Sequence, residues 1–275
     1  IDDDNMTFDI KLSQNSDNEI VEKKILLLVV NALKNNGYKL EKSNPKYIIS
    51  IKYSVNDGTN ISGTTSRPKI VPLTNKNIFS SAVNISKSLE LCTADHCLNI
   101  MPLFHIHGLI GILAASMKVG ASVCASNGFN AIKFLELAKS EKITWYSGVP
   151  TMHQAILLRA EKNLKLSKDL KLKFIRSSSA SLPPTVFENL KSVFKCPVIE
   201  SYGMTEATHQ MTSNPLPPKV QKPGFVGISA GPDVCIMDDS NKILNQGETG
   251  EVCIKGNNVT LGYENNPEAN KKSFS

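Results

Sequence analysis

Short apolar runs alternate with longer amphipathic segments through the middle of the chain, and this alternation predicts strands and helices in turn. Strand-length runs occupy residues 98–103, 121–125, 143–147, 172–175 and 197–201. Helical patterns occupy residues 74–89, 109–119, 131–140, 150–159 and 183–194. Thr74 is placed to cap the first of these helices, and prolines open the last two. Strands that alternate with helices predict a parallel sheet covered by helices on its faces.

The pattern differs at the two ends of the chain. Residues 1–18 are polar and acidic and predict a solvated tail, whereas residues 19–36 favour a helix and residues 46–55 alternate like a strand. After Gly224 the pattern changes to short β segments at 234–237 and 251–254, which predict a small antiparallel unit beside the sheet. We therefore divide the chain into a segment of unknown role (1–58), an α/β core (59–223) and a small β subdomain (224–275).

Polar residues follow several of the predicted strands. In an open α/β sheet the ligand crevice lies beyond the carboxyl ends of the strands. This rule brings His105, residues 177–181 and residues 202–206 to one place.

Composition narrows the class of protein. The chain has 275 residues with 41% apolar content, enough to bury a sizeable core. Its 31 basic and 25 acidic residues give a net charge of +6 with scattered lysines, which suits an anionic ligand better than nucleic acid. The apolar run 25–30 is far shorter than the roughly 20 residues of a membrane span, and acidic residues 2–4 stand where a signal peptide has basic ones.

The six cysteines form no CxxC pair and are typical of a reduced compartment. Cys92, Cys97 and His96 lie close together in sequence, but no second pair of metal ligands lies nearby. We therefore interpret the cysteines as small core residues.

The hydroxyl-rich segment 60–69 is a candidate phosphate-holding loop. Its backbone N–H groups, hydroxyl groups and one ammonium group could surround a phosphate, and a plain surface connection is the alternative. Pro68 separates the glycine from the lysine, so this is not a Walker loop. The candidate phosphate ligands are Ser62, Gly63, Thr64, Thr65, Ser66 and Lys69.

Five motifs in order resemble the AMP-forming acyl-CoA ligases and adenylation enzymes. After the loop come Pro-Leu-Phe-His-Ile-His-Gly at 102–108, Ser-Ser-Ser-Ala-Ser-Leu at 177–182, Tyr-Gly-Met-Thr-Glu at 202–206 and Gly-Glu-Val-Cys-Ile-Lys-Gly at 250–256. Segments 66–68, 204–209, 213–217 and 265–271 look most like the oxalate CoA ligase branch. The resemblance covers about residues 59–275 and stops before the family's Thr-Gly-Asp segment and its C-terminal lysine domain. It implies an incomplete adenylate-forming large domain with a nucleotide-binding core.

The resemblance also implies the chemistry. A small carboxylate, with oxalate favoured, would be activated by ATP and Mg²⁺ as an acyl-adenylate and then transferred to coenzyme A. The implied catalytic residues are Thr205, Glu206 and His105, with Glu206 holding the metal. The implied adenine contacts are Ser179, Ala180 and Tyr202. The implied substrate contacts are His105, Ser179 and His209. A cytoplasmic or peroxisomal location follows from the family and the reduced cysteines.

Several alternatives stay open from the sequence. Thr205 and Glu206 could simply start a helix, Tyr202 could pack in the core, and His107 fits a structural role better than His105 does. The same fold could serve an aryl or fatty acid, or bind nucleotide without turnover. Oligomeric state is not predicted.

Overall fold

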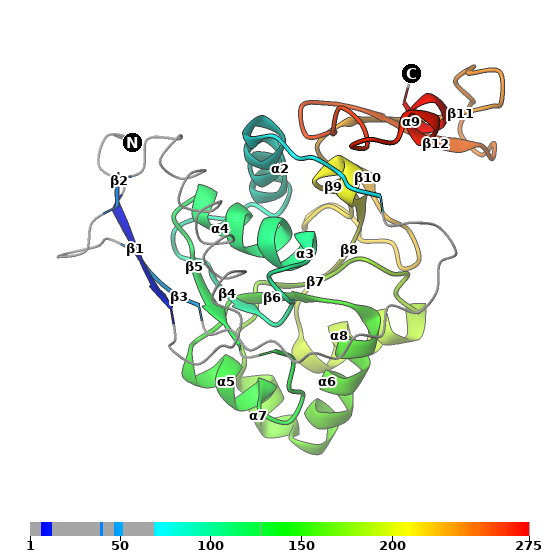
Figure 1. Ribbon diagram of the computed structural model, residues 1–275. Coiled ribbons are helices and arrows are strands. Elements are labelled where there is room, and N and C mark those ends of the chain that lie inside the picture. The colour runs from blue at the N-terminus through cyan, green and yellow to red at the C-terminus, as the bar shows by residue number, and fades with distance from the viewer. Residues whose placement is uncertain (1–6, 13–38, 41–46, 52–68, 127, 275) are drawn as a thin grey trace.

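The computed structural model describes residues 7–12, 39–40, 47–51, 69–126 and 128–274. A seven-stranded sheet crosses its centre in the order β10-β9-β8-β7-β6-β4-β5 (Figure 1). Its strands are β4 (His96–Asn99), β5 (Ser122–Ala125), β6 (Trp145–Gly148), β7 (Phe174–Ser177), β8 (Val198–Met204), β9 (His209–Ser213) and β10 (Ile228–Ser229). Strands β4 to β8 are parallel, and β9 and β10 add to them in antiparallel fashion. The predicted α/β class with a mostly parallel sheet is confirmed.

Helices cover both faces of this sheet (Figure 1). One group comprises α2 (Asn75–Ser88), α3 (Ile106–Gly108), the π-helical segment η2 (Leu109–Ala114) and α4 (Ala115–Lys118). The opposite face carries α5 (Phe134–Ser140), α6 (Pro150–Lys162), α7 (Leu164–Asp169) and α8 (Pro184–Phe194). Thr74 caps α2 as predicted, in a reciprocal capping box with Asn77. Pro150 and Pro184 occupy the first turns of α6 and α8, where a missing N–H costs nothing.

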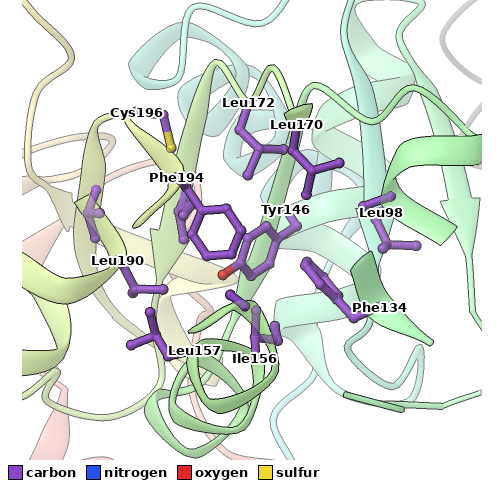
Figure 2. Close-up of a cluster of buried hydrophobic side chains, with 14 of the residues drawn as sticks. Leu98, Phe134, Tyr146, Ile156, Leu157, Leu170, Leu172, Leu190, Phe194 and Cys196 are labelled. Atoms are coloured by element: carbon purple, nitrogen blue, oxygen red, sulfur yellow. The ribbon is translucent and has the colours of Figure 1, made fainter. Parts of the chain in front are cut away.

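Alternate residues of the parallel strands enter two separate cores, as the period of two requires. Tyr146, Ile175 and Val198 pack toward α5, α6 and α8. Their chain neighbours Trp145 and Phe174 pack on the opposite face, toward α2 and η2. Figure 2 shows the first of these cores, with the Tyr146 ring at its centre. The apolar runs of the central strands β6 and β7 are continuous because both faces of these strands are buried.

Several predicted boundaries differ from the structure by a few residues, and asparagine side chains explain two of these differences. Strand β4 ends at Asn99 and does not reach residue 103, because the Asn99 side chain accepts a hydrogen bond from the N–H of Met101 (3.0 Å) and turns the chain. Helix α5 begins at Phe134 and not at residue 131. Asn130 accepts hydrogen bonds from the N–H groups of Ile132 and Lys133 and forms the turn before it.

Two smaller sheets accompany the main one. Strands β11 (Asp233–Met237) and β12 (Glu251–Lys255) pair antiparallel, which confirms the predicted β unit near the C-terminal end, and α9 (Pro267–Ser273) follows. Strand β1 (Thr7–Leu12) pairs in parallel with β2 (Lys39–Leu40) and β3 (Tyr47–Ile51). The expectation of a solvated tail is therefore wrong for the stretch that forms β1, where backbone pairing outweighs the polar composition. The helix predicted at 19–36 lies outside the described residues, as do both ends of the strand predicted at 46–55.

Within the described ranges, no helix is both long and apolar enough to cross a membrane.

Candidate active site

The segment after β7 lies between the carboxyl ends of β6 and β8. The N–H of Ser178 donates to the carbonyl of Gly148 at the end of β6 (3.2 Å). The hydroxyl of Ser178 donates to the carbonyl of Ser201 in β8 (3.1 Å). These bonds hold Ser179, whose φ is +71°, on the exposed surface at the strand ends. A left-handed serine is strained, and such strain concentrates at functional sites.

His107 lies beneath this segment. It is fully buried, its Nδ1 lies 3.1 Å from the hydroxyl oxygen of Ser179, and its Nε2 lies 2.6 Å from that of Ser147. Both ring nitrogens therefore have partners, as expected of a structural histidine. His105 is exposed, and its Nδ1 accepts a hydrogen bond from the N–H of His107 (3.0 Å). Partial burial lowers the pKa of His105 below its usual value, so the neutral ring is favoured at neutral pH.

His209 is placed against His107, although the two lie on different elements. Their rings stack with centroids 5.0 Å apart, and only 3% of His209 is exposed. Its backbone has a φ of +96°, and it follows Thr208, whose φ is +49°. Burial first, and then the nearby charge of Arg176, hold the pKa of His209 well below its usual value. His209 is therefore a neutral, buried side chain that packs against His107.

Arg176 connects these groups, and the sequence analysis did not single it out. It is fully buried in β7, and its guanidinium donates to Nε2 of His209 (3.0 Å), to Oε1 of Gln210 (3.0 Å) and to the hydroxyl of Ser147 (3.3 Å). No carboxylate in the described part of the chain forms an ion pair with it. Burial lowers the pKa of Arg176 to about 9, which leaves it cationic at neutral pH.

Glu206 and Lys69 meet at a third residue, Tyr263. The Tyr263 hydroxyl donates to Oε1 of Glu206 (2.7 Å), and the Lys69 ammonium lies 4.7 Å from the centroid of the Tyr263 ring. Burial and the Glu206 carboxylate raise the pKa of Tyr263, so the tyrosine keeps the proton that it donates. Lys69, at the end of the predicted phosphate loop, and Glu206, the predicted metal ligand, therefore contact the same tyrosine, while residues 62–66 of the loop lie outside the described part of the chain.

Backbone bonds hold this arrangement together from three segments. The N–H of Thr260 donates to the carbonyl of Glu206 (2.8 Å), and the N–H of Glu264 donates to the carbonyl of Ile70 (2.9 Å). The hydroxyl of Thr260 donates to the carbonyl of Pro72 (2.6 Å). The segment before α2 and the segment after β12 are therefore hydrogen-bonded to each other next to Glu206. Both lie above the sheet in Figure 1.

The donor set beside Glu206 fits Mg²⁺ and phosphate. The second carboxylate oxygen of Glu206 receives no hydrogen bond from a described residue, and Mg²⁺ typically takes one or two carboxylates together with substrate phosphates. Among the described residues no three His, Cys, Asp or Glu side chains cluster as a metal site. Lys69 is exposed and forms no ion pair with a carboxylate in the part of the chain that the structure describes.

The remaining predicted residues lie on the exposed rim. Thr205 is exposed and starts a single 3₁₀ turn over Thr205–Ala207, whose N-cap position is Met204. The alternative of a helix start is therefore met in part, because the turn begins at Thr205 with Glu206 in it, although Thr205 does not cap it. Tyr202 is 40% exposed, so its ring is not enclosed by the core. Ala180 is exposed as well.

A separate cavity of about 620 Å³ lies along β4 and β5, lined by residues that include Leu98, Val123 and Phe134. None of the predicted site residues lines it. The candidate site is therefore defined by the side-chain contacts at the strand ends and not by this cavity.

Comparison with known proteins decides the family. The profile of the AMP-binding enzyme family matches residues 41–264. The chain belongs to the AMP-binding enzyme family. Oxalate–CoA ligase of Arabidopsis thaliana is 48% identical over 216 residues, and oxalate–CoA ligase of Saccharomyces cerevisiae is 46% identical over 213 residues. Each alignment covers 78% of this chain, but only 42% and 38% of the respective relatives.

A solved structure supports the fold of an AMP-binding enzyme. o-Succinylbenzoate coenzyme A synthetase of Bacillus subtilis, in complex with ATP and magnesium ion, superposes with a TM-score of 0.71 at 23% identity. The match covers 98% of this chain and 64% of that one. The chain thus has the fold of part of an adenylate-forming enzyme, as the motifs predicted.

Three residues that shape the site were missed from the sequence. Arg176 had a signal, because it interrupts the apolar strand Phe174–Ser177 with a charge. Gly111 and Tyr263 had no comparable signal, since their roles depend on contacts with His209 and Glu206, which are distant in sequence.

Proposed function

We propose that the protein activates a small dicarboxylate, with oxalate favoured, as an acyl-adenylate and then transfers the acyl group to coenzyme A. A substrate carboxylate oxygen attacks the α-phosphorus of ATP, and pyrophosphate leaves. The coenzyme A thiolate then attacks the acyl carbon, and AMP leaves. The chain spans about two fifths of the relatives that it matches, so it would supply part of this machinery.

The contact of both Lys69 and Glu206 with Tyr263 is the observation that carries this proposal. Phosphoryl chemistry concentrates negative charge on phosphate oxygens, so a site needs a fixed cation and a metal ligand within one triphosphate length. In our proposal Lys69 and the hydroxyl groups of residues 62–66 bind the β- and γ-phosphates. Glu206 holds Mg²⁺, which neutralises charge on the phosphates when bound.

The rim residues have complementary roles in the proposal. Thr205 presents an exposed hydroxyl beside Glu206, suited to donate to the α-phosphate. The exposed ring of Tyr202 offers a flat face to adenine, while the small side chains of Ser179 and Ala180 allow close approach of the nucleotide.

The proposed acid site is polar. His105, Ser179 and His209 lie around His107, and His105 is near enough to His209 for a positive charge on one to lower the pKa of the other. A second carboxylate needs hydrogen-bond donors, because burying an unpaired charge in an apolar tunnel is costly. The names of the relatives from Arabidopsis thaliana and Saccharomyces cerevisiae, both oxalate–CoA ligases, support oxalate as the acid.

Calorimetric titration with ATP and Mg²⁺ tests the nucleotide half of the proposal. We expect saturable binding that weakens by at least about tenfold in Glu206→Gln, since a charged ligand loses its charge. Glu248→Gln is the control, because Glu248 is an exposed carboxylate in the turn between β11 and β12. If binding is absent, or if the control weakens it equally, the protein has the fold but does not bind ATP at this site.

A further inference from the structure

We propose that Arg176 is a positioning residue that directs two hydrogen-bond arms, so that Ser179 and His209 both present protons to the anionic end of the acid substrate. This inference rests on the proposed function for its substrate, but its geometric part can be tested without turnover.

The first arm runs from Arg176 to His209. A guanidinium can only donate, so His209 Nε2, 3.0 Å from the guanidinium nitrogen, must accept with its lone pair. Because burial and the Arg176 charge keep the ring neutral, its single proton then resides on Nδ1. That nitrogen forms no hydrogen bond with a described residue, and in the proposal its proton is the one that a ligand receives.

The second arm runs through Ser147 and His107 to Ser179. Ser147 accepts from Arg176 (3.3 Å), and its hydroxyl oxygen lies 2.6 Å from Nε2 of His107. In the proposed direction Ser147 donates to Nε2. The His107 ring, which is neutral because burial lowers its pKa well below the usual value, then carries its proton on Nδ1 and donates it to the hydroxyl oxygen of Ser179 (3.1 Å). The exposed Ser179 hydroxyl is then left with its own proton to donate outward.

The backbone around His209 is shaped to hold its ring against Arg176. Thr208 and His209 both have positive φ, and the hydroxyl of Thr208 donates to the carbonyl of Asn258 (2.7 Å). A Cβ on Gly111 would lie 2.5 Å from Cδ2 and 2.6 Å from Nε2 of His209, so only glycine leaves room for the ring. Gly111 lies in the π-helical segment η2, and π-helical turns are frequent at functional sites.

The charge of Arg176 explains why a dicarboxylate would be selected. Its guanidinium is fully buried, its Nε has no hydrogen-bond partner, and no described carboxylate neutralises it. A carboxylate bound at Ser179 and His209 would gain from this positive charge through both arms, because hydrogen bonds in a chain polarise one another. A hydrocarbon tail at the same place would bury the two donors without acceptors.

Nuclear magnetic resonance of ¹⁵N-labelled histidines tests the direction of the first arm. The chain has five histidines, and His209→Gln assigns the relevant signals by their loss. We expect His209 protonated on Nδ1 at pH 7.5 in the unmodified protein. In Arg176→Met we expect the Nε2–H form to appear, since no donor then opposes it. Protonation on Nε2 in the unmodified protein, or an unchanged tautomer in a folded Arg176→Met protein, would overturn the proposal. If Arg176→Met does not fold, the tautomer of the unmodified protein decides.

Pyrophosphate exchange with the whole protein tests the consequence for the acid. Arg176→Met should raise the KM for oxalate by about tenfold or more, while the KM for ATP changes by less than about twofold. Leu190→Ala is the control for lost stability, because Leu190 is buried in the other core and lies far from these histidines in the fold. A parallel rise in both KM values, or the same change in the control, would show that Arg176 is only structural. A protein without exchange activity would contradict the proposed function, whereas the histidine tautomers would still report on Arg176.

Discussion

Substituting Gly111 by alanine tests whether the fold is built around the His209 ring. The added methyl group would lie 2.5 Å from Cδ2 and 2.6 Å from Nε2 of His209, closer than real Cβ contacts. The ring has little freedom to move away. The ring stacks on that of His107, and its Nε2 accepts from Arg176. The backbone carbonyl oxygen of His209 lies against Gly203.

Two costs and one smaller gain determine the expected change in stability. Overpacking of a core by one methyl group typically costs about 1–3 kcal/mol. Displacing His209 Nε2 from the guanidinium loses a charge-assisted hydrogen bond of about 1.5–3 kcal/mol. Alanine gains up to about 1 kcal/mol over glycine within a helical segment, which offsets part of this cost. We therefore expect Gly111→Ala to lower the free energy of unfolding by about 1.5–5 kcal/mol.

Urea denaturation at pH 7.5 measures this change, with Gly148→Ala as the matched control. Gly148 is also a buried glycine near the site, but a Cβ there meets only ordinary contacts of 3.4 Å or more. The control should lose less than about 1 kcal/mol. If Gly111→Ala is as stable as the control and its His209 signals are unchanged, the reasoning about this ring is refuted.

Three further outcomes follow from burial and charge. Burial lowers the pKa of His153 to about 4 from an ordinary value of 6.5, so below pH 6.5 the unfolded chain binds a proton that the folded chain refuses. Unfolding free energy should therefore fall by on the order of 3 kcal/mol between pH 6.5 and 4 from this residue, and a pH profile unchanged in His153→Gln would contradict the assignment. Tyr263→Phe removes the hydroxyl that orients Glu206, and calorimetry should show about tenfold weaker binding of ATP with Mg²⁺, whereas unaltered affinity would show that the contact is incidental. Phe187→Ala should cost about 3–5 kcal/mol in urea denaturation because the ring is buried, and a loss no larger than that of the exposed Phe225→Ala would argue against this packing.

The parallel part of the sheet was predictable because its central strands bury apolar side chains such as Trp145, Tyr146, Phe174 and Ile175 on both faces. The antiparallel strand β9 was not predicted, although every one of its residues is buried. Its side chains are largely polar, and their burial is sustained by hydrogen bonds from other segments. Gln210, for example, accepts from Arg176 and donates to Ser88 (2.9 Å). Apolar periodicity cannot reveal a strand whose interior contacts are polar.

The site was predictable in so far as it lies in motifs at strand ends. His105 and Ser179, which the rule about strand ends placed together, both contact His107, and so does His209, which that rule did not include. Lys69 and Glu206 both contact Tyr263. The groups that orient them were not predictable. Tyr263 follows Glu206 by 57 residues, and the side-chain partners of Arg176 come from two other strands, β6 and β9. Such contacts follow from the register of the sheet, which a single sequence does not specify.

The acid preference of the whole protein is the most direct test of the account. ATP–pyrophosphate exchange should be measured with oxalate and with a medium-chain fatty acid at equal concentration. The polar cluster of His105, Ser179 and His209 predicts faster exchange with oxalate. Much faster exchange with the fatty acid would contradict a site built for a small dicarboxylate.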